Sequence, residues 1–162
     1  MIRKIGEMLE IAEEREIMLL INGRPHYLMC TPTMLKELAI GFAISEGIAK
    51  KVEDLKVEVD EDIVFIDTNS KNAEIKYHTS GCIGVRSLFE GRIESKIRFK
   101  VEELRNYLNL LEVEEYKKTR GYHIAVVIEK NRFFRTHDVG RHNAVDKAIG
   151  LALLNKANLQ ES

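Results

Sequence analysis

The sequence has little of several features that would place a protein in a specialised class. Its 162 residues include two cysteines, two prolines and no tryptophan, and 25 lysines and arginines balance 26 aspartates and glutamates. Two cysteines cannot build a disulfide framework or a four-cysteine zinc site. A net charge of -1 lacks the positive footprint of most nucleic-acid-binding proteins. We therefore predict a globular protein that has no nucleic-acid partner and holds no structural zinc.

Long apolar runs are also missing. No stretch approaches the roughly 20 apolar residues that cross a bilayer. Charged residues follow Met1 closely, where a signal peptide would continue with an apolar segment. These absences predict a cytoplasmic protein with no membrane partner. Because a domain typically has about 100–200 residues, the length predicts one domain or two small lobes that share a core.

What is present in the first half predicts two hairpins and a helix. Residues 16–30 are two apolar runs around Asn22-Gly23, a dipeptide typical of tight β-turns. A second hairpin is predicted over residues 56–67, around an acidic turn. Between them, residues 31–33 supply the start of a helix and Gly47 its stop. Helical spacing is shown by Leu35, Leu38, Ala39 and Phe42.

The second half predicts two helices and another pair of strands. Apolar residues spaced from Val101 to Leu111 indicate an amphipathic helix that runs to about Lys118 and stops at Gly121. Residues 122–129 and 132–137 are predicted strands around a short turn. A final helix follows residue 140, with Val145, Ile149 and Ala152 on one face. The order of elements predicts an α+β fold, similar to α/β, with a mixed sheet and flanking helices.

Cys82 is the strongest candidate for chemistry. Thiol chemistry requires an accessible thiolate near positive charge, and Cys82 lies between Gly81 and Gly84 with Arg86 four residues on. The alternative is that Cys82 is a small buried side chain, the usual role of a free cysteine. We expect residues 79–86 to be mobile. Cys30 ends an apolar strand and is predicted to be buried and less reactive than Cys82.

A second candidate site is an anion pocket at the turn before the last helix. Gly140 would let a ligand approach the backbone, the helix N-terminus offers N–H groups, and Arg141 and His142 add positive charge. The alternative is ordinary capping by Asp138 with solvated charges. His123 lies in an apolar strand and is expected to be a core histidine. Zinc deaminase chemistry is excluded because the sequence has neither His-x-Glu nor Pro-Cys-x-x-Cys.

Several motifs, in the same order along the chain, resemble the formate dehydrogenase accessory protein family, the FdhD sulfurtransferases. They are MCTP at 29–32, ELAIGF at 37–42, SEGI at 45–48, TSGC at 79–82 and DVGRHNAVDK at 138–147. The resemblance implies a cytoplasmic sulfur carrier and sulfurtransferase. Such a protein takes sulfur from a cysteine desulfurase as a cysteine persulfide. It passes the sulfur to the molybdenum or tungsten bis-pterin guanine dinucleotide cofactor, as acceptor, before the cofactor enters formate dehydrogenase.

Carried over by residue, Cys82 is the persulfide-bearing position that the resemblance implies. The predicted cofactor-binding residues are Asp138, Gly140, Arg141, His142, Asn143 and Lys147. No bound metal of its own is expected. The family often has Cys-x-x-Cys in this loop, and here Val85 stands at the second position. A mechanism that needs a resolving thiol is therefore less favoured than a relay through a single persulfide.

The resemblance also implies an organisation. Residues 1–75 would be an N-terminal lobe of hairpin and helix, and residues 76–162 a catalytic lobe similar in fold to cytidine deaminases but without zinc, frequently in a homodimer. Full-length members continue for roughly another hundred residues, the size of a small domain. A shortened or split chain is thus expected, with a cofactor site that is incomplete or completed by a partner. The alternative function is a non-catalytic chaperone of the same pathway that binds the cofactor or a nucleotide.

Overall fold

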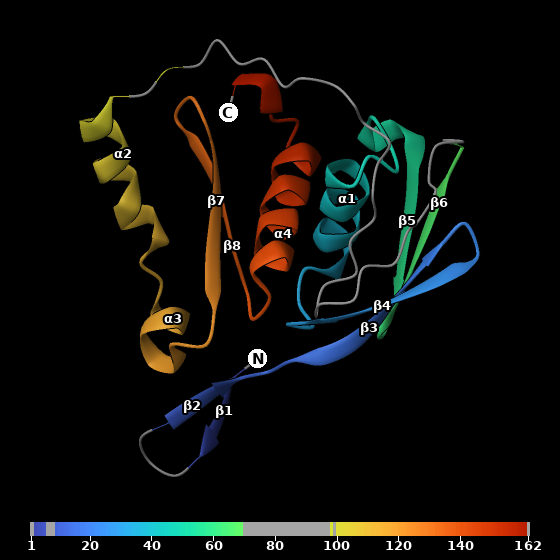
Figure 1. Ribbon diagram of the computed structural model, residues 1–162, viewed down its shortest axis with the longest axis horizontal. Coiled ribbons are helices and arrows are strands. Elements are labelled where there is room, and N and C mark those ends of the chain that lie inside the picture. Colours follow the sequence, from blue (N-terminus) through green and yellow to red (C-terminus); the bar gives the residue numbers. More distant parts are fainter. Residues whose placement is uncertain (1, 6–8, 70–97, 99, 162) are drawn as a thin grey trace.

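The computed structural model describes residues 2–5, 9–69, 98 and 100–161 of the chain. Two helices, α1 (Leu35–Ser45) and α4 (Arg141–Leu154), lie side by side at the centre with a sheet on either side (Figure 1). None of the described helices is long and apolar enough to cross a membrane. The predicted α+β fold with flanking helices is confirmed. The predicted boundary between residues 75 and 76 lies outside the described residues.

The larger sheet has four strands in the order β4-β3-β6-β5. Strand β3 pairs antiparallel with β4 and parallel with β6, which makes the sheet mixed, as predicted. Asn22 and Gly23 both have positive φ, 46° and 78°, as the tight turn of the first hairpin requires. The second predicted hairpin is also present. The strands are β3 (Arg15–Ile21), β4 (Arg24–Cys30), β5 (Leu55–Asp60) and β6 (Ile63–Thr68).

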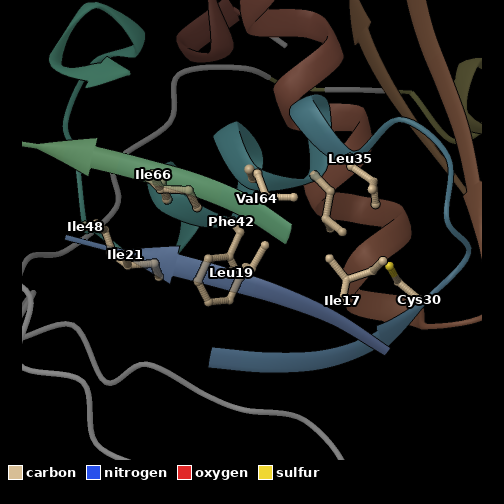
Figure 2. Close-up of a cluster of buried hydrophobic side chains, with 12 residues drawn as sticks. Ile17, Leu19, Ile21, Cys30, Leu35, Phe42, Ile48, Val64 and Ile66 are labelled. Carbon is tan, nitrogen blue, oxygen red and sulfur yellow. The ribbon is translucent and has the colours of Figure 1, made fainter. Parts of the chain in front are cut away.

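The main apolar core fills the space between this sheet and α1 (Figure 2). Alternate side chains of β3 point toward the helix because successive residues of a strand face opposite sides. Each fully buried Ile, Leu or Phe side chain contributes about 1.5–3 kcal/mol to folding. The cluster consists of Ile17, Leu19, Ile21, Cys30, Leu35, Leu38, Ala39, Phe42, Ala43, Ile48, Val64 and Ile66.

The smaller sheet in the second half is the predicted hairpin of β7 (His123–Glu129) and β8 (Arg132–Asp138). One face packs on α4 around Phe134, Ala152 and Ala157. On its other side lie α2 (Val101–Leu108) and α3 (Glu114–Thr119) (Figure 1). A separate hairpin joins β1 (Ile2–Ile5) to β2 (Leu9–Ala12). Short 3-10 turns occupy Val52–Asp54, Asn109–Leu111 and Leu159–Glu161.

The single helix predicted from residue 101 to about 118 is wrong. Helix α2 ends at Leu108, a 3-10 turn follows, and α3 starts after Val113, whose extended backbone breaks the helix. Val113 is buried, whereas the apolar stripe of the predicted helix is exposed. Because of this break, Val113 points into the core, and the apolar residues of the predicted stripe do not. The exposed members of the stripe are Val101, Leu104, Leu108 and Leu111.

Two local predictions at the central helices also need correction. Helix α1 begins at Leu35, and its N-cap is Met34 in a left-handed conformation, so the segment 31–33 does not cap it. On α4, Val145 is 47% exposed while Lys147 is fully buried. Because α4 is enclosed by α1 on one side and the β7–β8 hairpin on the other, its burial does not follow apolar spacing.

Candidate functional site

Cys82 and the predicted mobile loop 79–86 lie outside the described residues, so both stay predictions. The other thiol, Cys30 at the end of β4, is fully buried, as predicted. Burial raises the pKa of the Cys30 thiol to about 12, and the nearby Asp138 carboxylate adds to this shift. Almost no Cys30 thiolate is present near neutral pH. A thiol at this position is therefore unsuited to nucleophilic chemistry.

The turn between β8 and α4 is built on a buried ion pair. Asp138 ends β8 and Lys147 lies on α4; both side chains are fully buried, with Nζ 2.5 Å from Oδ2 of Asp138. The other carboxylate oxygen accepts hydrogen bonds from the Gly140 amide at 2.7 Å and from Nδ2 of Asn143 at 3.2 Å. The buried carboxylate is thus paired and hydrogen-bonded, as a charge out of water must be.

The same pair ties this turn to the segment between β4 and α1. The backbone amide of Thr31 donates to Oδ2 of Asp138 at 3.1 Å, and the Thr31 carbonyl accepts from Lys147 Nζ at 2.8 Å. The Thr31 hydroxyl accepts a hydrogen bond from the Val139 amide at 3.2 Å. Asn143 donates to the Met29 carbonyl at 2.8 Å. Residues more than one hundred positions apart are thereby held in one polar network.

The predicted site residues divide into two groups in space. Asp138, Gly140, Asn143 and Lys147 belong to the network, and the side chains of Asp138 and Lys147 are fully buried. Arg141 and His142, on the first turn of α4, are exposed. Whether any of the six residues contacts a ligand stays a prediction. The buried Asp138–Lys147 pair stabilises the turn before α4, and the exposed side chains of Arg141 and His142 project from that turn.

Sequence reasoning missed Thr31, Ser45 and Asp146. Thr31 was interpreted as a helix start, and no sequence signal links it to a turn over one hundred residues away. Asp146 is 7% exposed on α4 and accepts a hydrogen bond from the Ser45 hydroxyl of α1 at 2.7 Å. The sequence DK at 146–147 places two charges on consecutive residues of a helix, and both are buried. That juxtaposition is visible only once α4 is known to be enclosed.

Asp146 is expected to make stability depend on pH. Burial raises the pKa of its carboxyl from 3.8 to about 6, although Ser45 and the positive charge of His142 oppose the shift. Between about pH 4 and 6 the folded chain keeps a proton that the unfolded chain has lost, so stability falls as pH rises through this window. This titration lowers the free energy of unfolding of the parent by up to about 3 kcal/mol as pH rises. We expect Asp146→Asn to lack this decrease and to be more stable than the parent at pH 7.5.

Urea unfolding of both proteins at pH 4 and pH 7.5 measures this effect. The quantity to compare is the change in the free energy of unfolding between pH 4 and pH 7.5, because other titrating groups contribute equally to that change in parent and variant. An unchanged pH dependence in Asp146→Asn would show that Asp146 titrates normally.

The two histidines near the start of the hairpin have different surroundings. His123 is exposed, so the predicted core histidine is wrong: it is the first residue of β7, where the side chain reaches solvent. His137 is half-buried, and its ring lies 4.7 Å from that of Tyr122 at an angle of 60°. Burial lowers the pKa of His137. Within the described part of the chain, no three His, Cys, Asp or Glu side chains gather as metal ligands would.

Comparison with known proteins identifies the family. The model of the FdhD/NarQ family matches residues 12–162, nearly the whole chain. The chain belongs to the FdhD/NarQ family. One relative, the sulfur carrier protein FdhD of Shouchella clausii, is 33% identical over 92% of this chain and 64% of its own length. Another of the same name, from Methanothermobacter thermautotrophicus, is 26% identical over 99% of this chain and 68% of its own.

A solved structure supports the fold. A protein described as a formate dehydrogenase accessory protein, from Desulfotalea psychrophila, superposes with a TM-score of 0.72 at 23% identity. The match covers 95% of this chain and 64% of that protein. The chain therefore spans less than two thirds of the Shouchella and Desulfotalea proteins. The likeness to cytidine deaminases that the family resemblance implied stays a prediction.

Proposed function

We propose that this chain is a sulfur carrier that accepts sulfur as a persulfide on Cys82 and delivers it to a pterin guanine dinucleotide cofactor of molybdenum or tungsten. The observation that carries the proposal is the span of the family match. It includes both the TSGC motif of residues 79–82 and the turn at 138–147, and relatives that match over most of this chain are named sulfur carrier proteins. The client would be formate dehydrogenase and the donor a cysteine desulfurase.

Loading of the carrier requires no net oxidation. The Cys82 thiolate attacks the outer sulfur of the desulfurase persulfide, a new S–S bond forms, and the old S–S bond breaks with its electron pair on the desulfurase cysteine. That cysteine leaves as a thiolate and takes up a proton from water. Cys82 is the suitable thiol for this step because Cys30 is fully buried and its pKa is raised to about 12.

Delivery has a different electron balance. When the terminal sulfur leaves Cys82 as sulfide, the electron pair of the S–S bond stays on Cys82 and two further electrons are needed. We infer that the acceptor metal supplies them and is oxidised by two electrons, so it must arrive in a reduced state. The chain's own part is to hold an anionic acceptor, for which the Arg141 guanidinium supplies positive charge and the His142 ring a hydrogen-bond donor, both on the first turn of α4.

Mass spectrometry tests the carrier directly. After incubation with a cysteine desulfurase and cysteine, we expect an added mass of about one sulfur atom on the peptide that contains Cys82 and on no other, since thiolates are the sulfur acceptors. Cys82→Ser should carry none, and Cys30→Ser should load as the parent does. An unmodified Cys82 beside a self-loaded desulfurase would refute the proposal.

The alternative is a chaperone that binds the cofactor without transferring sulfur, which the Val85 position favours because a second thiol is missing there. Guanine nucleotide binding separates the two when read with the sulfur assay. We expect Arg141→Ala to weaken binding about tenfold to a hundredfold by removing a charge-assisted contact, and Cys82→Ser to leave it unchanged. Nucleotide binding without any loading of Cys82 would favour the chaperone.

A further inference from the structure

The four-stranded sheet has a second face, opposite the one that packs on α1. Figure 2 shows Ile17, Leu19 and Ile21 of β3 on the side of α1, so the residues that alternate with them point the other way. We call this second side the outer face. Its apolar members are Met18 and Leu20 of β3, Pro25, Tyr27 and Met29 of β4, and Ile63 and Phe65 of β6.

The strand register arranges most of these residues in two rows across the sheet. Tyr27 and Met29 are each 49% exposed. Neighbouring strands lie about 4.8 Å apart, so a row across three strands is about 10 Å wide, which is close to the diameter of one α-helix. The two rows are Tyr27–Met18–Ile63 and Pro25–Leu20–Phe65.

An apolar outer face requires an explanation. A sheet face that meets only water usually carries polar side chains at alternate positions, whereas a sheet that is apolar on both faces is covered on both. Helix α1 covers the inner face of this sheet. A second covering element, on the outer face, is therefore expected, and a helix packed on a sheet is one of the few stable layer arrangements.

The outer face has an acidic border along β5. Both rows continue onto this strand, where they end at Asp60 and Glu58. Glu58 is paired with Lys56 at 3.0 Å, but Asp60 is exposed and none of the described residues supplies a cation to it. Residues 53–67 carry seven acidic side chains and one lysine. Each row thus passes from apolar side chains on β4 to negative charge on β5.

This charge decides which occupant fits. Nucleic acids and anionic membrane surfaces are repelled by an acidic border. A second copy of the chain has a net charge of -1 and so brings no excess of cations. A protein segment with an apolar stripe and with cations along one flank complements both the rows and the border.

We propose that the outer face docks an amphipathic helix of a partner protein. The apolar stripe of that helix packs on the two rows, and lysine or arginine side chains on its flank lie over Asp60 and Glu58. The interaction goes beyond sulfur transfer and uses neither Cys82 nor the turn before α4. A failure of Cys82 to accept sulfur would therefore refute the proposed function and leave this surface as it is.

A synthetic helical peptide of leucine and lysine, about 14 residues or four turns long, is the probe. Its binding is measured by fluorescence anisotropy. The first control peptide has glutamate in place of lysine and should bind at least tenfold more weakly, because it keeps the stripe and reverses the charge. The second has the leucines and lysines in scrambled order and should also bind weakly, because it lacks the stripe.

Two substitutions at exposed positions test the surface itself. Tyr27→Ser should weaken the leucine–lysine peptide about tenfold by removing apolar contact area. Asp60→Lys should weaken that peptide about fivefold and strengthen the leucine–glutamate peptide. The matched controls are Leu108→Ser and Glu102→Lys on α2, also at exposed positions. Their binding should stay within about twofold of the parent.

Several results would overturn the inference. They include no binding by the parent, equal binding by the parent and Tyr27→Ser, and weaker binding in Leu108→Ser alone, which would place the peptide on α2. Sedimentation that shows a parent dimer and a Tyr27→Ser monomer would assign the face to a second copy. A urea midpoint that falls much further in Tyr27→Ser than in Leu108→Ser would show that the chain covers this face itself.

Discussion

Replacing Lys147 by methionine is expected to lower the free energy of unfolding by about 3–5 kcal/mol, the cost of leaving one partner of a buried ion pair without the other. Methionine is similar in length, so the change leaves little cavity. What is lost is the ammonium group that lies 2.5 Å from Asp138 and 2.8 Å from the Thr31 carbonyl. That carbonyl would then be buried without this donor, and the carboxylate without its counter-charge.

Urea unfolding followed by circular dichroism measures the loss. The matched control is Lys36→Met on α1, at an exposed position of a neighbouring helix, where the stability should change by no more than about 0.5 kcal/mol. The double variant Asp138→Asn/Lys147→Met should be more stable than the sum of the two single changes predicts, because removing both charges leaves neither of them unpaired. A loss below about 1 kcal/mol in Lys147→Met would mean that water enters to solvate Asp138.

The Lys147 variant also bears on the candidate site. The turn before α4 is fixed by Asp138, whose carboxylate accepts the Gly140 amide at 2.7 Å. If the pair positions Arg141, nucleotide binding at this turn should weaken in Lys147→Met even under conditions where the variant is fully folded.

Local signals in the sequence were sufficient for turns and for short elements. Asn22-Gly23 predicted the first hairpin because only such residues adopt positive φ readily, and the structure has that turn. Gly47 likewise has a φ of 70° two residues after α1 ends. These features depend on the conformational preference of one or two residues. Such preferences can be predicted from the sequence because they do not depend on contacts with the rest of the chain.

Features that depend on contacts distant in sequence were not predictable in the same way. The apolar spacing from Val101 to Leu111 favoured one long amphipathic helix, yet nothing in the described part of the chain covers that stripe, and Val113 is buried instead. Lys147 was predicted to bind the cofactor because it belongs to the motif at 138–147 that resembles the family. In the structure the Lys147 side chain is fully buried and bonded to Thr31 and Asp138. Thr31 could be placed beside Asp138 only by knowing how α1 meets α4.

The way α1 meets α4 leads to the second large effect: Gly150→Ala is expected to destabilise the protein by about 3 kcal/mol or more, at the upper end of overpacking costs. An added Cβ at Gly150 would lie 1.9 Å from the Glu37 carbonyl oxygen of α1. The contact is reciprocal, since a Cβ at Gly41 of α1 would lie 1.8 Å from the Asp146 carbonyl oxygen of α4. Both obstacles are backbone atoms, so the helices would have to separate.

The sign of this effect is its sharpest test. In an unconstrained helix interior, alanine is favoured over glycine by about 1 kcal/mol, so a helix that did not need this glycine would gain stability from the change. Gly150→Ala and Gly41→Ala are compared in urea with Val145→Ala, at an exposed position of α4 where a change within about 0.5 kcal/mol is expected. Separation of the helices would also lengthen the Ser45–Asp146 hydrogen bond, now 2.7 Å, across the same interface. The pH dependence of stability assigned to Asp146 should therefore change in both glycine variants and persist in Val145→Ala. Increased stability of either glycine variant would contradict the prediction, because it would show that the two helices are free to move apart.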